Sequence, residues 1–149
     1  MRIILEGCDG VGKSTLAESL ASTYCCDIIH MTRWSNKTFD TYIEKMLMNN
    51  IIFDRCFISE YIYSHIFNRI TEISDKDIET LLNVAKALDY HIFILTCNND
   101  ELIKRLKNRN NETDDIIDNT IKINDMYVDF ATKYDIKIIG KEDINEIIW

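Results

Sequence analysis

The chain contains no proline and only 4 glycines among its 149 residues. It also has no low-complexity tract and no internal repeat, so nothing in it resembles a linker between two domains. The length suits one compact unit that buries its own hydrophobic core. We therefore predict a single domain over residues 1–149.

Long apolar runs are missing as well. No stretch approaches the roughly 18 apolar residues that a membrane-spanning helix needs, so we expect no association with a membrane. We also expect no secretory leader, because Arg2 is followed at once by a short strand-like run. The 5 cysteines are odd in number and contain no C-x-x-C pair, which is typical of a reducing compartment and not of a disulfide framework or zinc site. We predict a cytoplasmic protein.

Positive charge is scarce. The 17 Lys and Arg residues are outnumbered by 25 Asp and Glu, which gives a formal net charge of −8. Surfaces that bind nucleic acid need many cationic contacts to phosphates, so we predict no nucleic-acid partner. A small anionic ligand is compatible with this charge if a few cations converge locally.

The residues that are present alternate between short apolar runs and amphipathic stretches. The apolar runs predict strands over residues 2–6, 27–31, 49–54, 90–96 and 135–140. The amphipathic stretches predict helices over residues 14–24, 39–49, 58–70, 74–88, 98–109 and 113–134, and a short helix that ends at Trp149. Ser74 and Asp77 form a variant of the capping box at the start of one of them. Strands that do not alternate in polarity indicate a parallel sheet covered on both faces, an α/β three-layer fold.

Three of the four glycines lie within residues 7–12, directly before Lys13 and Ser14. This G-x-x-x-x-G-K-S pattern fits a phosphate-binding P-loop, and it lies between a predicted strand and a predicted helix, as that loop requires. Glycines let backbone N–H groups approach phosphate oxygens, and the following helix directs its positive end at the same anion. Lys13 would neutralise the β- and γ-phosphates, and Ser14 would bind Mg²⁺. The predicted ATP-binding residues are Gly7, Cys8, Asp9, Gly10, Val11, Gly12, Lys13, Ser14 and Thr15.

Two further segments place charge near the predicted loop. The run at 49–54 ends in Asp54 and is followed directly by Arg55, and a cation directly after an acid points to an anionic acceptor. Arg105 and Arg109 lie four residues apart on one predicted helical face, where arginines can steady a transferring phosphoryl group. The guanine-reading Asn-Lys-x-Asp tetrad of small GTPases is not matched, because TCNNDE at 96–101 lacks the lysine.

Three segments resemble one family. LEGCDGVGKST resembles the P-loop of thymidylate kinases, DRCFISEYIYS resembles the D-R-x-x-x-S segment that they share with deoxynucleoside kinases, and LIKRLKNRNNETDD resembles their lid. The three follow in the right order, so the resemblance covers the whole chain, and the short viral type is the most similar. It implies a P-loop NTPase fold with a five-stranded parallel sheet in the order 2-3-1-4-5, and a lid around residues 104–115.

The resemblance also implies roles for individual residues. Asp9 would contact the 3′-hydroxyl of the acceptor's sugar or a metal-bound water, and Asp54 would hold Mg²⁺ through water. Arg55 would bind the acceptor's phosphate. Arg105 and Arg109 would close over the donor phosphates as a lid, and Arg33 stands where the family often has another acceptor-side arginine. Trp34 and Tyr61 are further acceptor-side candidates.

One part of the chain departs from the family. The segment between the second and third predicted strands is far shorter than in thymidylate kinases, where it builds much of the acceptor pocket. It contains three aromatic candidates for stacking on a base, Trp34, Phe39 and Tyr42. The base therefore stays open at this stage, while Tyr63 and Phe67 are interpreted as core residues and the three histidines as structural.

We predict an enzyme, a P-loop kinase that transfers the γ-phosphoryl group of ATP, with Mg²⁺, to a deoxynucleoside monophosphate such as dTMP. A monophosphate needs a cation, which Arg55 supplies, whereas a hydroxyl acceptor needs a base, and residues 30–36 offer no carboxylate. Two alternatives stay open: a deoxynucleoside kinase that phosphorylates the 5′-hydroxyl, and a non-catalytic nucleotide-binding sensor. Related kinases are commonly dimers, so a homodimer is also left open.

Overall fold

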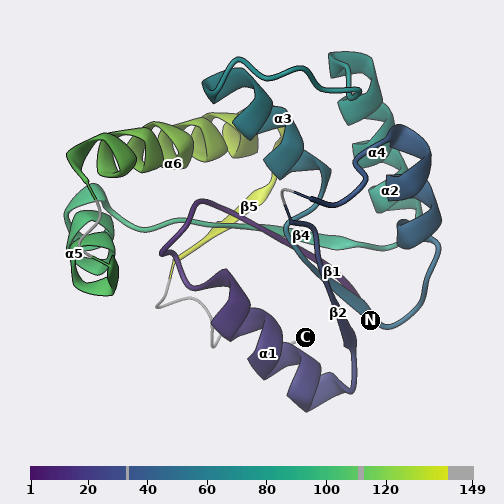
Figure 1. Cartoon of the computed structure of the whole chain (residues 1–149). Coiled ribbons are helices and arrows are strands. Elements are labelled where there is room, and N and C mark those ends of the chain that lie inside the picture. Colours follow the sequence, from purple (N-terminus) through teal and green to yellow (C-terminus); the bar gives the residue numbers. More distant parts are fainter. Residues whose placement is uncertain (33, 111–112, 141–149) are drawn as a thin grey trace.

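The computed structural model describes residues 1–32, 34–110 and 113–140, apart from the side chains of residues 109 and 110. Over these residues five parallel strands form one sheet in the order β2-β3-β1-β4-β5 (Figure 1). The strands are β1 (Arg2–Glu6), β2 (Asp27–His30), β3 (Ile51–Asp54), β4 (His91–Leu95) and β5 (Lys137–Ile139). The helices are α1 (Lys13–Tyr24), α2 (Phe39–Met46), α3 (Phe57–Ile66), α4 (Asp75–Ala87), α5 (Asn99–Asn110) and α6 (Asp114–Tyr134). The predicted fold class and strand order are confirmed.

The centre of the sheet is apolar on both faces. Ile3, Ile4 and Leu5 of β1 are completely buried, and every residue of β3 is buried too. Consecutive buried residues point to opposite faces of a sheet, so both faces must be covered. Figure 1 shows how: α1 lies on one face, and α3, α4 and α6 lie on the other. This confirms the predicted three layers.

The covering helices place some aromatic residues in the core. Tyr42 of α2 is completely buried and packs edge-on against Phe57, with their ring centroids 6.1 Å apart. The prediction that Tyr42 could stack on a base is therefore wrong, because its ring is already enclosed. Phe39, at the start of α2, is partly buried against the same core.

Helix boundaries differ from the predicted ones mainly at α3. The helix predicted over 58–70 ends at Ile66, and Ile70 is fully exposed. The isoleucines at four-residue intervals from Ile58 to Ile70, which suggested the longer helix, therefore continue beyond its end. At α4 the capping box of Ser74 and Asp77 is present as predicted. The predicted helix that ends at Trp149 lies outside the described residues. Within the described part of the chain, no helix has the length and apolar character needed to cross a bilayer.

Candidate active site

The glycine-rich loop connects β1 to α1 at the carboxyl edge of the sheet. Gly7, Gly10 and Gly12 all have positive φ angles, of 142°, 86° and 100°, a backbone conformation that other residues rarely adopt. At Gly7 a Cβ atom would lie 2.3 Å from the carbonyl oxygen of Leu95, so no side chain fits. Gly12 occupies the N-cap position of α1 and has no side chain to cap the first amides of the helix. The start of α1 is therefore suited to an external anion.

Lys13 is the first residue of α1, and its side chain reaches back to the loop. Its side chain is only 5% exposed, and its Nζ donates a hydrogen bond of 2.6 Å to the carbonyl oxygen of Cys8. Burial, and then the nearby Arg55, lower the pKa of Lys13 to about 8, although Asp9 and Asp54 oppose this shift. A bound phosphate would supply the counter-charge that the buried ammonium group needs.

Three polar side chains meet where β1, β2 and β3 end. The Ser14 hydroxyl donates a 2.7 Å hydrogen bond to Oδ2 of Asp54, and Nδ1 of His30 lies 3.1 Å from the same oxygen. The sheet register accounts for this, because His30 of β2 pairs with Asp54 of β3. His30 therefore belongs to the site, contrary to its interpretation as a structural residue.

The pair Ser14 and Asp54 has the right chemistry for magnesium. Mg²⁺ prefers oxygen ligands, and it is commonly held by one or two protein groups together with substrate phosphates and water. In the described residues no group of three or more His, Cys, Asp or Glu side chains could hold a metal ion by itself. A site shared with nucleotide phosphates fits this small protein donor set.

Arg55 connects the loop to the neighbouring cavity. Its backbone is in the left-handed region with φ 68°, and its Nη2 donates a 2.6 Å hydrogen bond to Oδ1 of Asp9. The guanidinium carbon lies 5.0 Å from the centroid of the Tyr63 ring. Burial alone would lower the pKa of Arg55, but Tyr63 and Asp9 raise it above its ordinary value. The cation therefore keeps its charge although its side chain is only 23% exposed.

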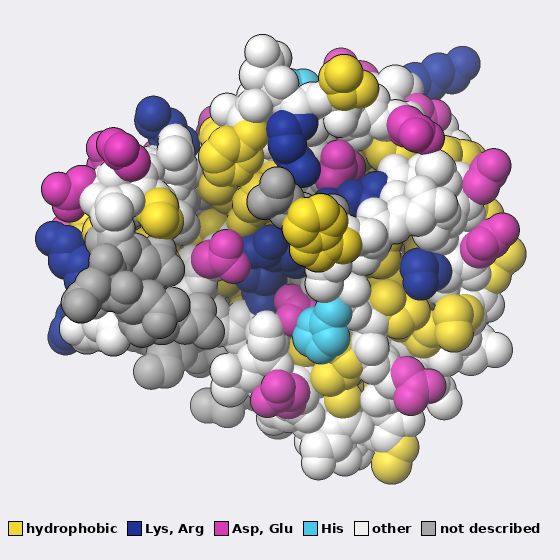
Figure 2. Space-filling view, in the orientation of Figure 1, with side chains coloured by type: hydrophobic (Ala, Val, Ile, Leu, Met, Phe, Trp, Pro, Cys, Tyr) yellow, Lys and Arg dark blue, Asp and Glu magenta, His cyan; other side chains and the backbone are white. Residues whose placement is uncertain are grey.

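A cavity of about 380 Å³ adjoins Arg55. Four of its lining residues lie on and beside α3 at four-residue spacing, so they share one helical face. The cavity is lined by Met31, Lys37, Arg55, Ser59, Tyr63, Phe67 and Arg69. Figure 2 shows Lys and Arg side chains grouped in a hollow near the centre of the molecular face, beside acidic and histidine side chains.

A buried carboxylate holds two of these cations. Lys37 Nζ lies 2.7 Å and Arg69 Nη2 lies 3.7 Å from Oε2 of Glu60. Sequence reasoning missed Lys37, Arg69 and Glu60, since nothing local marks them. It also placed Tyr63 and Phe67 in the core, although their spacing from Arg55 carried the signal that they share its face.

The acceptor-side candidates need one correction. Tyr61 packs its ring against His65 and Phe130, with centroids 4.3 Å and 5.7 Å away, and it is not among the residues that line the cavity. Tyr63 lines the cavity instead of Tyr61, because a shift of two residues turns a helical side chain to another face. Trp34 is 85% exposed, and Arg33 lies outside the described residues.

The predicted lid contributes one arginine to the loop. Arg105 of α5 donates from Nε to Glu101, over 2.8 Å, and from Nη1 to the carbonyl oxygen of Gly10, over 3.2 Å. It lines a second cavity of about 410 Å³, with Gly10, Gly12, Thr15 and Asn108. The side chain of Arg109 lies outside the described residues, so its role stays a prediction.

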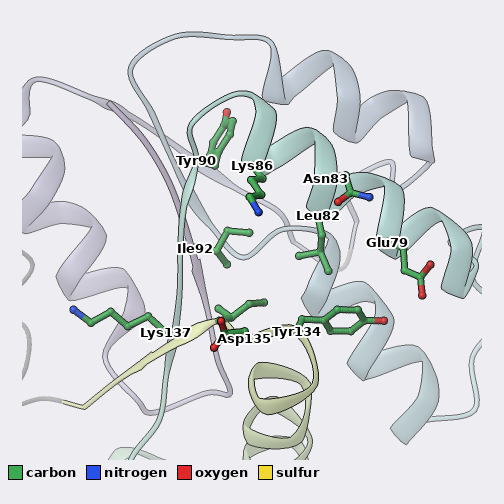
Figure 3. Close-up of a pocket in the computed structure, with 10 residues that line it drawn as sticks. Glu79, Leu82, Asn83, Lys86, Tyr90, Ile92, Tyr134, Asp135 and Lys137 are labelled. Carbon is green, nitrogen blue, oxygen red and sulfur yellow. The ribbon is translucent and has the colours of Figure 1, made fainter.

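A further cavity of about 600 Å³ lies away from these residues (Figure 3). It is bordered by α4, the end of α6 and the first part of β4 and β5, including Leu82, Tyr134 and Ile92. These are the amino ends of the strands, whereas the glycine loop follows the carboxyl end of β1. In α/β proteins of this architecture ligands bind at the carboxyl edge, so the site is assigned there.

Comparison with known families decides where the chain belongs. The sequence matches the AAA domain family over residues 3–125. The chain belongs to the AAA domain family. A comparison with curated protein sequences gave no significant match.

Solved structures similar to this AAA domain protein include a complex with phosphorylated GDP and two kinases. The YorR protein from Bacillus subtilis, solved in complex with phosphorylated GDP, has a TM-score of 0.78 and 21% identity, over 94% of this chain and 84% of that one. Deoxyadenosine kinase from M. mycoides has a TM-score of 0.62 and 19% identity, over 99% and 97%. Thymidylate kinase from Candida albicans has a TM-score of 0.58 and 21% identity, over 97% and 86%. The predicted nucleotide kinase-like P-loop fold is confirmed.

Proposed function

We propose that this AAA domain protein is a magnesium-dependent kinase that transfers the γ-phosphoryl group of ATP to a deoxynucleoside monophosphate, with dTMP as the first acceptor to test. The observation that carries the proposal is Arg55. Its charged group contacts Asp9 of the glycine loop on one side and lines the 380 Å³ cavity on the other. A cation in that position would hold an acceptor phosphate against the donor phosphates.

The donor side would act by positioning and charge neutralisation. The loop amides and Lys13 would hold the ATP phosphates, and Arg105 would reach them from α5, where it already contacts Gly10. Ser14 and Asp54 would hold Mg²⁺, which when bound neutralises charge on the β- and γ-phosphates. Arg109 would add a second cation on the same side.

The acceptor side offers charge and aromatic surface together. Lys37 and Arg69 line the cavity with Arg55, and this concentration of cations suits an anionic acceptor in a protein that is acidic overall. Tyr63 lines the same cavity, and its ring, whose centroid lies 5.0 Å from the guanidinium carbon of Arg55, offers an aromatic surface to a base. Arg33 and Trp34 stay acceptor-side candidates, since both lie just after Met31 of the cavity wall.

The experiment is ADP production from ATP and Mg²⁺ with a panel of deoxynucleosides and their monophosphates. With its preferred monophosphate, the Arg55→Ala variant should raise the acceptor KM by about 10- to 100-fold, because a desolvated charge pair is lost, and change the ATP KM by less than about 3-fold. Lys122→Ala, which removes an exposed charge on α6, is the matched control and should leave both unchanged. An Arg55→Ala variant with an unchanged acceptor KM would contradict the role of Arg55.

A deoxynucleoside kinase is the second candidate, and the contact between His30 and Asp54 favours it. A hydroxyl acceptor must lose a proton, and a histidine beside a carboxylate can accept one. Turnover with deoxynucleosides only, lost in His30→Ala, would support this candidate over the monophosphate kinase. Tight ATP binding without turnover of any acceptor would instead support a nucleotide sensor. The single domain, the cytoplasmic location and the homodimer stay predictions.

A further inference from the structure

Glu6, the last residue of β1, has its carboxylate completely buried. Oε1 accepts hydrogen bonds from the backbone N–H groups of Cys56, over 2.9 Å, and Ser59, over 3.2 Å. Oε2 accepts from the Ser59 hydroxyl and from the Tyr127 hydroxyl, the latter over 3.3 Å. Burial raises the pKa of Glu6, while the hydrogen bonds from Ser59 and Cys56 and the charge of Arg55 lower it. A buried acid with this many partners is costly to replace.

These bonds close the amino end of α3. Cys56 occupies the N-cap position of that helix, but its side chain does not cap it. The first amides of a helix have no partner within the helix and need an acceptor from elsewhere. Here the acceptor is a carboxylate from another element, which also complements the positive end of the helix dipole. Glu6 therefore caps α3 from β1.

The neighbouring residues extend the same connection. The N–H of Arg55 donates a 3.0 Å hydrogen bond to the carbonyl oxygen of Leu5, so consecutive residues of β1 hold consecutive amides of the turn into α3. Arg55 adopts a left-handed backbone in this turn, a conformation that must be held by its surroundings. The side chain of Arg55 then reaches the cavity that Ser59 and Tyr63 also line.

Glu6 is also directly followed by Gly7, the first residue of the glycine loop. The residue that caps α3 is thus covalently next to the loop proposed to hold the donor phosphates. A displacement of α3 relative to that loop would move Arg55, Ser59 and Tyr63 together. Phosphoryl transfer is sensitive to displacements of about 1 Å between its reactants.

We propose that Glu6 is a positioning residue, which fixes the acceptor-binding helix α3 and Arg55 against the phosphate-binding loop. This inference rests on the proposed kinase function and adds a residue to its acceptor side. A positioning role differs from that of an ordinary core residue. Replacing a core residue would lower the stability of the fold without a selective rise in the acceptor KM.

The test compares Glu6→Leu, which has a similar volume and cannot accept a hydrogen bond, with Glu6→Gln, which still can. In Glu6→Leu the acceptor KM should rise by about tenfold or more, and the ATP KM should change by less than about 3-fold. Glu6→Gln should restore the acceptor KM to within about 3-fold of the wild-type value, since its side-chain oxygen can still cap α3. Ile78→Val, in the core part of α4, controls for a general loss of stability and should change neither KM.

Two measurements keep this test independent of the proposed function. Hydrogen exchange at the amides of residues 56 and 59 should be faster in Glu6→Leu than in Glu6→Gln, whether or not the chain has kinase activity. If the wild-type protein turns over no acceptor, the proposed function fails, and the positioning role is then judged by exchange and by calorimetric binding of dTMP. Equal exchange in both variants, or equal losses for ATP and acceptor, would overturn it. If Glu6→Leu does not fold, Tyr127→Phe, which removes a hydroxyl that donates to Oε2 of Glu6 and that does not line the cavity, should raise the acceptor KM about 5-fold with the ATP KM unchanged, and an unchanged acceptor KM overturns the inference.

Discussion

The helices α1 and α3 follow two neighbouring strands, β1 and β3, yet their first amides meet different partners. At α1 the N-cap is Gly12, which brings no side chain. At α3 the N-cap side chain does not help either, but Glu6 supplies a carboxylate. The start of α1 is therefore suited to an anionic ligand, whereas the start of α3 is occupied by the carboxylate of Glu6.

The difference in capping suits a different task for each helix. A helix start bound to an internal carboxylate is fixed permanently, which suits a helix that presents cavity residues. A helix start with glycines before it can approach a phosphate closely and release it after turnover. Far from the site, α4 uses a third solution, since Ser74 and Asp77 cap it locally.

The largest expected effect lies at the helix start arranged for an external anion. Lys13→Ala should lower kcat by about 100- to 1000-fold, because one preorganised positive charge beside the transferring phosphoryl group is lost. ADP production with saturating ATP and acceptor measures this. Lys122→Ala, an exposed lysine on α6, should retain full activity. Full activity in Lys13→Ala would show that the loop does not act on phosphate.

The glycines of the same loop should differ in their structural importance. Gly7→Ala should lower the free energy of unfolding by about 3 kcal/mol, because the new Cβ meets the Leu95 carbonyl oxygen at 2.3 Å and the φ of 142° is strained. Gly12→Ala meets no atom within 4 Å and should lose only about 1 kcal/mol through its strained φ of 100°. Urea unfolding measures both. Equal losses would contradict the close contact at Gly7.

Nucleotide binding should depend on pH through Lys13. Its pKa in the folded protein is about 8, below the ordinary value of 10.5, so the folded state binds fewer protons than the unfolded state between these values. Stability should rise with pH across this window, while binding of phosphate, which needs the ammonium form, should weaken. We expect ADP affinity without Mg²⁺ to fall about tenfold from about pH 7 to about pH 9.

Lys13→Arg is the matched variant for this prediction. Its guanidinium group stays charged throughout the range, so its ADP affinity should vary little with pH, whatever its absolute value. Calorimetric titration at several pH values compares the two proteins. The same slope in both would assign the pH dependence to another group.

An effect on stability alone, as small as that of Gly12→Ala, is expected at the locally capped helix α4. Ser74→Ala removes the oxygen that accepts from the N–H of Asp77, and it should lower the free energy of unfolding by about 1 kcal/mol. Neither KM should change, because α4 does not line the 380 Å³ cavity beside Arg55. Thermal unfolding and steady-state kinetics test the two parts separately. A changed acceptor KM would mean that helix starts throughout the fold affect the site, and not only that of α3.

The accuracy of the sequence predictions varied with how local the signal was. The position of the glycine loop between a strand and a helix was predicted correctly, and so was the strand order implied by the resemblance, since both follow from short motifs. The cavity was not predicted. Its lining residues Lys37 and Arg69 are 32 residues apart in sequence, and only the pairing of both with Glu60 brings them together.

The choice of Tyr61 over Tyr63 shows a second kind of limit. Both lie on α3, and the isoleucines at 58, 62 and 66 had defined its buried face. The face of α3 that lines the cavity begins with Arg55. Ser59 and Tyr63, four and eight residues later, lie on the same face. Helical periodicity predicts which residues share a face, but it does not by itself identify the element that each face contacts.

The sequence by itself determined the phosphate-binding loop, the parallel α/β architecture and the elements on which the reacting groups would lie. These features depend on backbone conformation and on the hydrophobic pattern, which are determined by residues close together in the sequence. Only the tertiary structure decided that Glu6 caps α3, that His30 contacts Asp54 and that the cations gather around one cavity. Those contacts join residues up to 53 positions apart in the chain, so they exist only once the sheet has set its strand order.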